Sequence, residues 1–186
     1  MSKIAGVLGL QGAYEKHLKM LDRLGIKSIL VRYPEEIDQC DGLVIPGGES
    51  STMSKLIDQM HLRQPLLDYN RPILATCAGV ILLSENDPSE KVQPLGKLPI
   101  LCQRNAYGRQ VESFTTPVKI QNQSKNFTAI FIRAPKISQL NSEEIEVLAE
   151  YDNSPILLQW KNILAATFHP ELTDDTRIHE KFINLL

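Results

Sequence analysis

A cysteine in the first half of the chain stands in a context that suits nucleophilic catalysis. Cys77 lies in "ILATCAGVILL", between two apolar runs, with Ala75 and Gly79 two residues away on either side. A strand that turns sharply into a helix exposes the residue at the turn, and small neighbours are needed because the backbones crowd there. Amides at the helix start favour the thiolate, the form that attacks a carbonyl carbon. Cys77 is therefore a candidate nucleophile, with a small buried core residue as the alternative.

The histidines decide whether this cysteine has a candidate base. His169 ends the apolar stretch "ILAATF" and opens "HPEL", at the carboxyl end of a predicted strand, where sites on open parallel sheets collect. Glu171 can reach back to its imidazole and fix the tautomer and charge. We interpret the two as a base and its orienting carboxylate, with a polar surface turn as the alternative. His17, His61 and His179 lie in helical stretches among polar neighbours, and we expect them on solvated faces.

A glycine-rich segment, "PGGESS" at residues 46–51, is the third candidate element. Its glycines let the backbone approach a ligand closely, and amides at the following helix start could bind a carboxylate or a developing oxyanion. The amide of Ala78, directly after the cysteine, could bind the same oxyanion. Neither a Gly-Lys-Ser/Thr sequence nor GxGxxG spacing is present, so a nucleotide phosphate loop is not indicated. Alone, such a segment is often only a turn.

Alternating strands and helices in the first half would position these residues. Apolar strands alternating with helices indicate a parallel sheet covered on both faces, hence an α/β fold. We expect strands in 3–10, 27–33, 41–45 and 71–76. Helices are expected in 12–25, after an N-cap at Ser50 or Ser51 through about Met60, and after Cys77 through about Ser84.

The second half has a different pattern. Short strand-like stretches at 109–120, 127–132, 145–151, 155–160 and 163–168 indicate antiparallel additions or edge hairpins, and a last helix is expected from about Asp174 to Leu186.

Composition limits the classes of protein and partner. With 186 residues and 42% hydrophobic content, we expect one core and a single domain over residues 1–186. A net charge of -2 without basic blocks argues against nucleic acid. The short apolar run at the start meets charged residues too soon for a signal peptide, and no stretch approaches membrane-span length, so we expect a cytoplasmic protein without a membrane partner. Cys40, Cys77 and Cys102 have neither disulfide-framework nor metal-site spacing.

Together these motifs resemble the class I, triad-type glutamine amidotransferases, which combine a Gly-rich oxyanion strand, a cysteine elbow and a late His-x-Glu pair. Within that family, the chain is similar to the glutaminase subunits of pyridoxal 5'-phosphate synthases. The pieces "GLQG", "RN-Y-GRQ" and "FIRAP" are specific to that subunit, and Ala75 departs from its usual glycine. The resemblance is carried by "GVLGLQGAYEKH", "DGLVIPGGESSTM", "TCAG", "RNAYGRQVESF", "FIRAP" and "FHPELTDD", in that order along nearly the whole chain.

The resemblance implies a flavodoxin-like three-layer sandwich that hydrolyses L-glutamine to L-glutamate and ammonia. It assigns Cys77 as the nucleophile that forms a glutamyl thioester, His169 as general base and acid, and Glu171 as its orienting carboxylate. The oxyanion hole would consist of the amides of Gly48 and Ala78. No cofactor and no metal are expected in the glutaminase itself.

The resemblance also implies a substrate pocket and a partner. An arginine suits the carboxylate of glutamine, and a glutamate suits its ammonium group. The partner would be a (β/α)8-barrel synthase subunit that uses the ammonia to build pyridoxal phosphate, with Gln11 near the docking surface. Glutamine would be held by Gly48, Glu49, Ser50, Arg104, Ile132 and Arg133.

Three alternatives remain open at this point. A glutaminase serving another ammonia acceptor would keep the triad but lack "GLQG" and "FIRAP". A flavodoxin-like cysteine hydrolase or stress protein would share the elbow cysteine but not the late HPE with PGGES. A non-catalytic regulatory module is the third, and the three intact triad positions argue against it.

Overall fold

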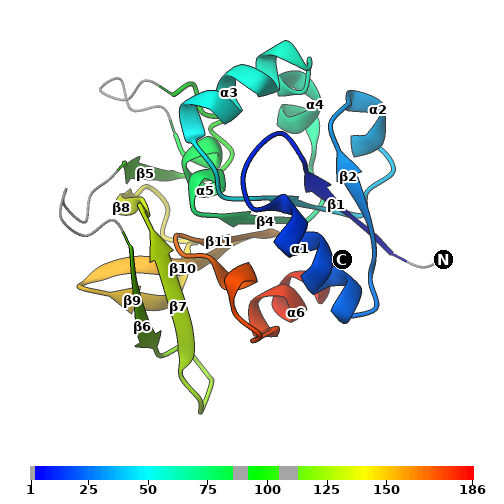
Figure 1. The fold of residues 1–186 in the computed structure, drawn as a ribbon. Coiled ribbons are helices and arrows are strands. Elements are labelled where there is room, and N and C mark those ends of the chain that lie inside the picture. Colours follow the sequence, from blue (N-terminus) through cyan, green and yellow to red (C-terminus); the bar gives the residue numbers. More distant parts are fainter. Residues whose placement is uncertain (1–2, 86–91, 105–112) are drawn as a thin grey trace.

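A seven-stranded sheet with helices on both faces forms the centre of the protein, as seen in a computed structural model that describes residues 3–85, 92–104 and 113–186 (Figure 1). The strand order is β2-β1-β3-β4-β11-β10-β9. The mutually parallel strands are β1 (Ile4–Leu8), β2 (Lys27–Val31), β3 (Gly42–Ile45), β4 (Ile73–Thr76) and β11 (Ile163–Ala166), and the antiparallel ones are β9 (Glu146–Tyr151) and β10 (Ser154–Trp160). This is the α/β, mostly parallel sheet with antiparallel additions that the sequence predicts.

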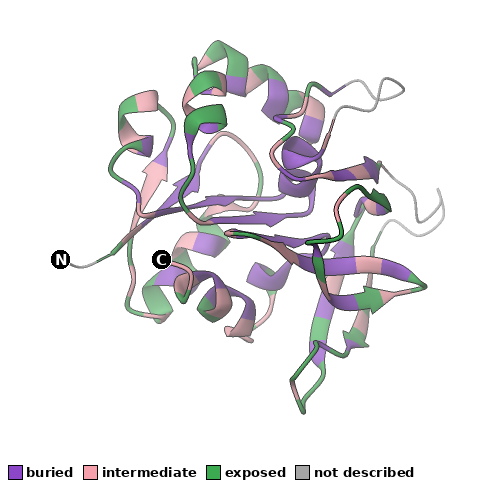
Figure 2. Ribbon diagram, turned by 180° about the vertical axis from the view of Figure 1, so that it is seen from behind, coloured by how far each residue is buried: buried purple, intermediate pink, exposed green. Residues whose placement is uncertain are grey.

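Helices cover the sheet because successive strand residues point to opposite faces. In β4, Ile73 and Ala75 join one hydrophobic core, whereas Leu74 joins the other. The first core includes residues of α2 (Pro34–Ile37), α3 (Ser50–Gln59), α4 (Arg63–Asp68) and α5 (Ala78–Leu83). The second includes residues of α1 (Tyr14–Arg23) and α6 (Arg177–Ile183). The central strands are buried between the two helical layers (Figure 2).

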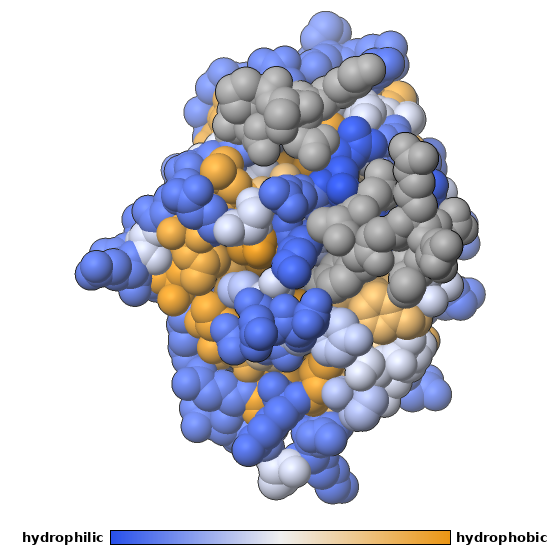
Figure 3. All heavy atoms as spheres, turned by 90° about the vertical axis from the view of Figure 1, so that its left-hand side faces the viewer, coloured by the Kyte–Doolittle hydropathy of each residue, from blue (hydrophilic) through white to orange (hydrophobic). Residues whose placement is uncertain are grey.

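Two small antiparallel sheets flank the large one. The first pairs β5 (Ile100–Gln103) with β8 (Lys136–Leu140), and the second pairs β6 (Ser113–Val118) with β7 (Phe127–Ile132). On the side of the molecule that carries them, hydrophobic side chains gather in several areas between hydrophilic ones (Figure 3). Exposed hydrophobic residues there include Ile132 of β7 and Leu140 of β8.

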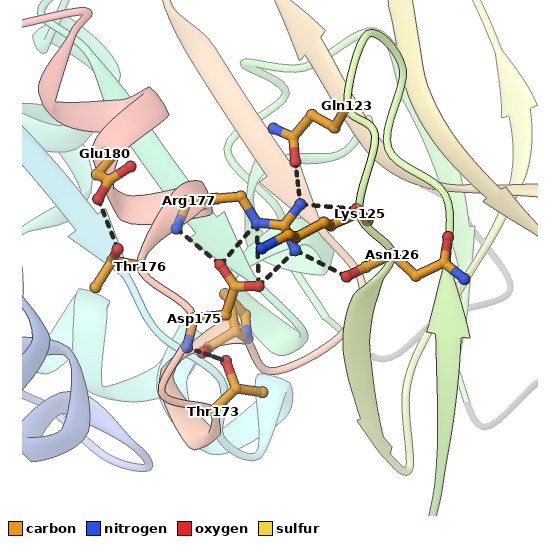
Figure 4. A network of polar contacts seen from close by, with 9 residues as sticks. Gln123, Lys125, Asn126, Thr173, Asp175, Thr176, Arg177 and Glu180 are labelled. Atoms are coloured by element: carbon orange, nitrogen blue, oxygen red, sulfur yellow. Dashed lines mark hydrogen bonds and ion pairs between the residues drawn. The ribbon is translucent and has the colours of Figure 1, made fainter.

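An arginine fastens the β6–β7 hairpin to the last helix. The Arg177 guanidinium donates to the backbone oxygens of Lys125 and Asn126, each at 2.9 Å, and to the side chain of Gln123 (Figure 4). Asp175 pairs with the same guanidinium and keeps its charge neutralised. The hairpin, whose strand β7 ends at Ile132, is thereby held against the body of the fold.

Several element boundaries differ from the sequence-based expectation. The cap of α3 was wrongly predicted as Ser50 or Ser51, because the Glu49 side chain accepts the amides of Ser51 and Thr52 and makes Glu49 the N-cap. The last helix begins at Arg177, after a short 3-10 turn, η1 (Pro170–Leu172). The short elements α2, α4, β5 and β8 were not predicted. The expected strand 109–120 lies partly outside the described residues, and β6 begins at Ser113.

In the described residues, no helix combines the length and the apolar character that crossing a membrane needs.

Gly79, in α5, lies against the backbone of β3. A Cβ at this position would lie 2.1 Å from the backbone oxygen of Ile45, a distance that no real Cβ contact reaches. Gly79→Ala should therefore push α5 away from β3 and lower the free energy of unfolding by about 1–3 kcal/mol, the range for overpacked sites. Chemical denaturation measures this as a lower midpoint at constant m value, and an unchanged midpoint would contradict the close approach.

Candidate active site

A pocket of about 360 Å³ opens where the parallel strands end. It is lined by every residue that the sequence places in the site except Glu171, which lies behind His169. The carboxyl ends of β3, β4 and β11, followed by the glycine-rich segment, the cysteine turn and His169, converge on it. This is the position where open α/β sheets bind ligands.

Cys77 occupies the strained turn between β4 and α5. Its φ of 47° and ψ of -111° lie in a region that residues with a side chain rarely adopt. Two backbone bonds hold it there: its amide donates to Ala166 at 2.8 Å, and its carbonyl accepts from Val80 at 3.0 Å. The thiol is 5% exposed and lies 3.8 Å from the backbone oxygen of Ile132. The expected elbow is present, and Cys77 lines the pocket.

His169 is bonded on both sides of its ring. Its Nδ1 lies 2.6 Å from Oε1 of Glu171, which leaves Nε2 as the nitrogen available to Cys77. Its backbone amide donates to Ile130 of β7 at 2.8 Å, so the small sheet fixes the histidine as well. Burial lowers the pKa of His169, but hydrogen bonds with Cys77 and Glu171 outweigh burial and raise it to about 10. The imidazole is therefore the cationic form at neutral pH.

Glu171 is a buried carboxylate, 4% exposed. Burial raises its pKa, but the electrostatic interaction with His17 and the hydrogen bond from His169 act in the opposite direction, and the net pKa is below the ordinary value. A buried carboxylate survives only when it is paired, and here the imidazolium of His169 provides that pairing. The His169–Glu171 unit has the geometry that a tautomer-fixing pair requires.

Two backbone amides belong to residues that line the pocket, Gly48 and Ala78. The Ala13 amide donates to the carbonyl of Gly47 at 3.2 Å. Because the carbonyl and amide of a trans peptide unit point in opposite directions, the amide of Gly48 is turned away from Ala13. Neither this amide nor that of Ala78 donates a hydrogen bond to any of the described residues. Both amides are thus unpaired within the described residues, and the direction of the Gly48 amide depends on the peptide unit that Ala13 holds.

The polar end of the pocket contains an arginine–glutamate pair. Arg104 Nη2 lies 2.9 Å from Oε1 of Glu49. The Thr52 hydroxyl donates to the other carboxylate oxygen at 2.7 Å, and this bond chiefly lowers the pKa of Glu49 to about 2. Ser50 is buried beside them as the first residue of α3. The remaining predicted binding residues also line the pocket: Ile132 is the last residue of β7, and Arg133 follows it.

Gln11 lies closer to the site than a purely peripheral docking residue would. Its side-chain oxygen accepts the amide of Glu49 at 2.7 Å. Together with the bond from Ala13 to Gly47, this contact ties the loop before α1 to the glycine-rich segment at two points.

Two histidines were wrongly expected on solvated faces. His17 and His179 are fully buried behind Glu171, whereas His61 is exposed as expected. A signal was present in the sequence: His17 precedes Met20 and Leu21 by three and four residues, which places it on the apolar face of its helix.

The motif "RNAYGRQVESF" lies for the most part outside the described residues, and only Arg104 and the start of β6 are placed. Within the described part of the chain, no cluster of three or more His, Cys, Asp or Glu side chains suits a metal ion. Cys40 and Cys102 are buried free thiols.

Comparison with known proteins places the chain in a family. The model of the SNO glutamine amidotransferase family matches residues 7–186. "Pyridoxal 5'-phosphate synthase subunit PdxT" of Thermosipho africanus (strain TCF52B) is 48% identical over 184 residues, covering 97% of both chains. The PdxT protein of Thermotoga maritima is 47% identical over 185 residues, covering 97% of this chain and 98% of its own.

A solved structure described as a glutamine amidotransferase has a TM-score of 0.90 and 38% identity, covering 97% of each chain. The fold, the family match over nearly the whole chain and the relatives agree with one another. This chain belongs to the SNO glutamine amidotransferase family.

Proposed function

We propose that this chain is the glutaminase subunit of a pyridoxal 5'-phosphate synthase. It hydrolyses L-glutamine to L-glutamate and ammonia, and the ammonia passes to a (β/α)8-barrel synthase subunit. The observation that carries the chemistry is the meeting of a strained cysteine, a charged His–Glu pair and two free amides in one pocket. The relatives named as subunits of this synthase support the choice of acceptor.

In the first half of the reaction, the Cys77 thiolate attacks the carboxamide carbon of glutamine. The carbonyl oxygen becomes an oxyanion, which the amides of Gly48 and Ala78 bind. His169 gives the proton on Nε2 to the departing nitrogen, so the C–N bond breaks and ammonia leaves. A glutamyl thioester on Cys77 remains.

In the second half, water attacks the thioester carbon while the now neutral imidazole of His169 takes its proton. The same two amides bind the second oxyanion, and the C–S bond breaks to release glutamate and the thiolate. Glu171 does not exchange a proton; it holds the imidazole in one orientation and stabilises the imidazolium that each half requires.

The substrate's α-amino acid end fits the polar end of the pocket. Glutamine carries a carboxylate and an ammonium group, and Arg104 and Glu49 offer the complementary charges within one ion pair. When glutamine binds, the ion pair between Arg104 and Glu49 is replaced by two ion pairs with the substrate. The charges of the pocket are therefore balanced both with and without substrate. Ser50, Ile132 and Arg133 complete the wall.

Docking of the synthase subunit near Gln11 gives it control over the oxyanion hole. The loop that carries Gln11 and Ala13 is bonded to Gly47 and Glu49, the residues on either side of the Gly48 amide. A partner that presses on this loop can set the direction of that amide. Such control has a chemical purpose, because a glutaminase that acted alone would waste glutamine.

Replacing the nucleophile tests the reaction directly. Cys77→Ala should reduce glutamate release by roughly 10⁶-fold, as loss of a catalytic nucleophile does, while the denaturation midpoint stays near that of the wild type. Cys40→Ala is the matched control, since it removes a buried thiol remote from the pocket and should keep activity. Mass spectrometry of acid-quenched wild-type protein should detect glutamylated Cys77. Normal turnover by Cys77→Ala would contradict the mechanism.

Gly12 tests the oxyanion amide. It has a φ of 89°, and a Cβ there would lie 1.8 Å from the oxygen of Gly47. Gly12→Ala should displace the peptide that carries the Gly48 amide and lower kcat by about 10²- to 10³-fold, the effect of losing one oxyanion donor.

Gly25→Ala is the matched control for this variant. Gly25 has a similar φ of 70°, but nothing lies within 4 Å of the added Cβ. It carries the same backbone strain without the collision, so kcat should stay close to the wild-type value. Equal losses in both variants would show that strain, and not the oxyanion peptide, is responsible.

A further inference from the structure

Two histidines that the proposed reaction does not use form a buried chain behind Glu171. Nδ1 of His17, on α1, lies 2.9 Å from Nε2 of His179, on α6. Nε2 of His17 lies 3.2 Å from Oγ1 of Thr76 and 3.4 Å from Oε2 of Glu171. The chain therefore runs from the outer helix α6 through α1 to the carboxylate that holds His169.

Both imidazoles are neutral. Neither ring is exposed to solvent, and burial is the main cause that lowers the pKa of each, to about 3 for His179. The titratable groups that face them are Glu171 and His169 on one side and each other in between. In a hydrogen bond between two neutral imidazoles, one of the facing nitrogens carries the hydrogen and the other accepts it. The direction of this hydrogen bond therefore fixes the tautomer of both rings.

One direction fits the surroundings better than the other. If His179 donates from Nε2, His17 carries its hydrogen on Nε2 and directs it at the Glu171 carboxylate and Thr76. The polar atom then left without a partner is Nδ1 of His179, an acceptor. A buried acceptor without a partner costs less than a buried donor without one.

The opposite direction has two costs. The Thr76 hydroxyl could then donate to Nε2 of His17, but the lone pair of that nitrogen would lie 3.4 Å from the Glu171 carboxylate. His179 would carry its hydrogen on Nδ1, where none of the described residues accepts it. These costs favour the first arrangement.

We propose that His17 is a positioning residue for the glutaminase reaction: its Nε2–H, fixed by a hydrogen bond from His179, holds the second oxygen of Glu171 so that the first oxygen stays on His169. The inference rests on the proposed function, since it extends the Cys–His–Glu unit by two residues. Oε2 forms no hydrogen bond with any of the described residues, and Nε2 of His17, which bonds to Thr76 at 3.2 Å, lies only 3.4 Å from it.

The consequence is a carboxylate held from both sides. Without His17, Oε2 would lose the ring nitrogen that lies 3.4 Å from it, and rotation of the carboxylate would loosen the 2.6 Å bond to His169. The pKa of Glu171 would rise, because removal of a donor disfavours the charged form. As the pH is lowered, the variant would then lose activity at a higher pH than the wild type.

Two amide variants of His17 separate positioning from packing. In His17→Gln the side-chain amide reaches the place of Nε2 and can still donate to Glu171. In His17→Asn the amide reaches only the place of Nδ1 and contacts His179. Both are polar, uncharged and similar in size, so a purely structural role would affect them alike.

The assay is the pH profile of kcat/KM for L-glutamine, with the synthase subunit present. His17→Asn should lose roughly 10- to 100-fold, the usual cost of removing an outer positioning group, and its acid limb should move to higher pH. His17→Gln should stay close to the wild type in both rate and profile. Equal losses in the two variants, no loss in either, or an unmoved acid limb would overturn the proposal.

A measurement on the wild-type chain keeps the test independent of variant folding. Long-range proton–nitrogen NMR should show His17 neutral near pH 7 with its hydrogen on Nε2, and His179 with its hydrogen on Nε2. A hydrogen on Nδ1 of His17 would overturn the proposal. If the wild-type complex released no glutamate, the proposed function would be wrong. The tautomer measured by NMR would still show the direction of the hydrogen bonds in that case.

Discussion

The pairing of a buried carboxylate with a buried imidazolium is the interaction on which the rest of the site depends. Glu171 and His169 are 4% and 7% exposed, so each charge is tolerable only because the other lies 2.6 Å away. Three parts of the fold position and enclose this pair. β11 lies beside the central strand β4 and is followed by the η1 turn, and α1 and α6 carry the two histidines that pack behind Glu171.

A second constraint is steric and acts at the cysteine. The strained backbone of Cys77 persists because β4, β11 and α5 over-determine it through backbone hydrogen bonds and close packing. Gly79 and Gly47 provide the room: a Cβ on Gly79 would strike Ile45, and one on Gly47 would lie 2.5 Å from the His169 ring. Strain at the nucleophile and small residues around it are thus two parts of one arrangement.

Much of this arrangement could be predicted from the sequence, for identifiable reasons. Apolar strands alternating with helices predict the parallel sheet, and residues that follow such strands meet at one edge, which is how Cys77 and His169 come together. Short elements such as α2 and α4 carry too few residues for a periodic signal. The burial of His17 and His179 was missed because polar neighbours along the chain outweighed the apolar helix face.

Glutamate release from L-glutamine by the purified chain, measured alone and with the pyridoxal 5'-phosphate synthase subunit, tests the central claim most directly. The account predicts that release rises sharply when the partner is added, by up to the roughly 10²- to 10³-fold that one oxyanion donor contributes. An equal rate with and without the partner would contradict the proposed coupling. Silence in both mixtures, with the complex confirmed, would contradict the glutaminase reaction itself.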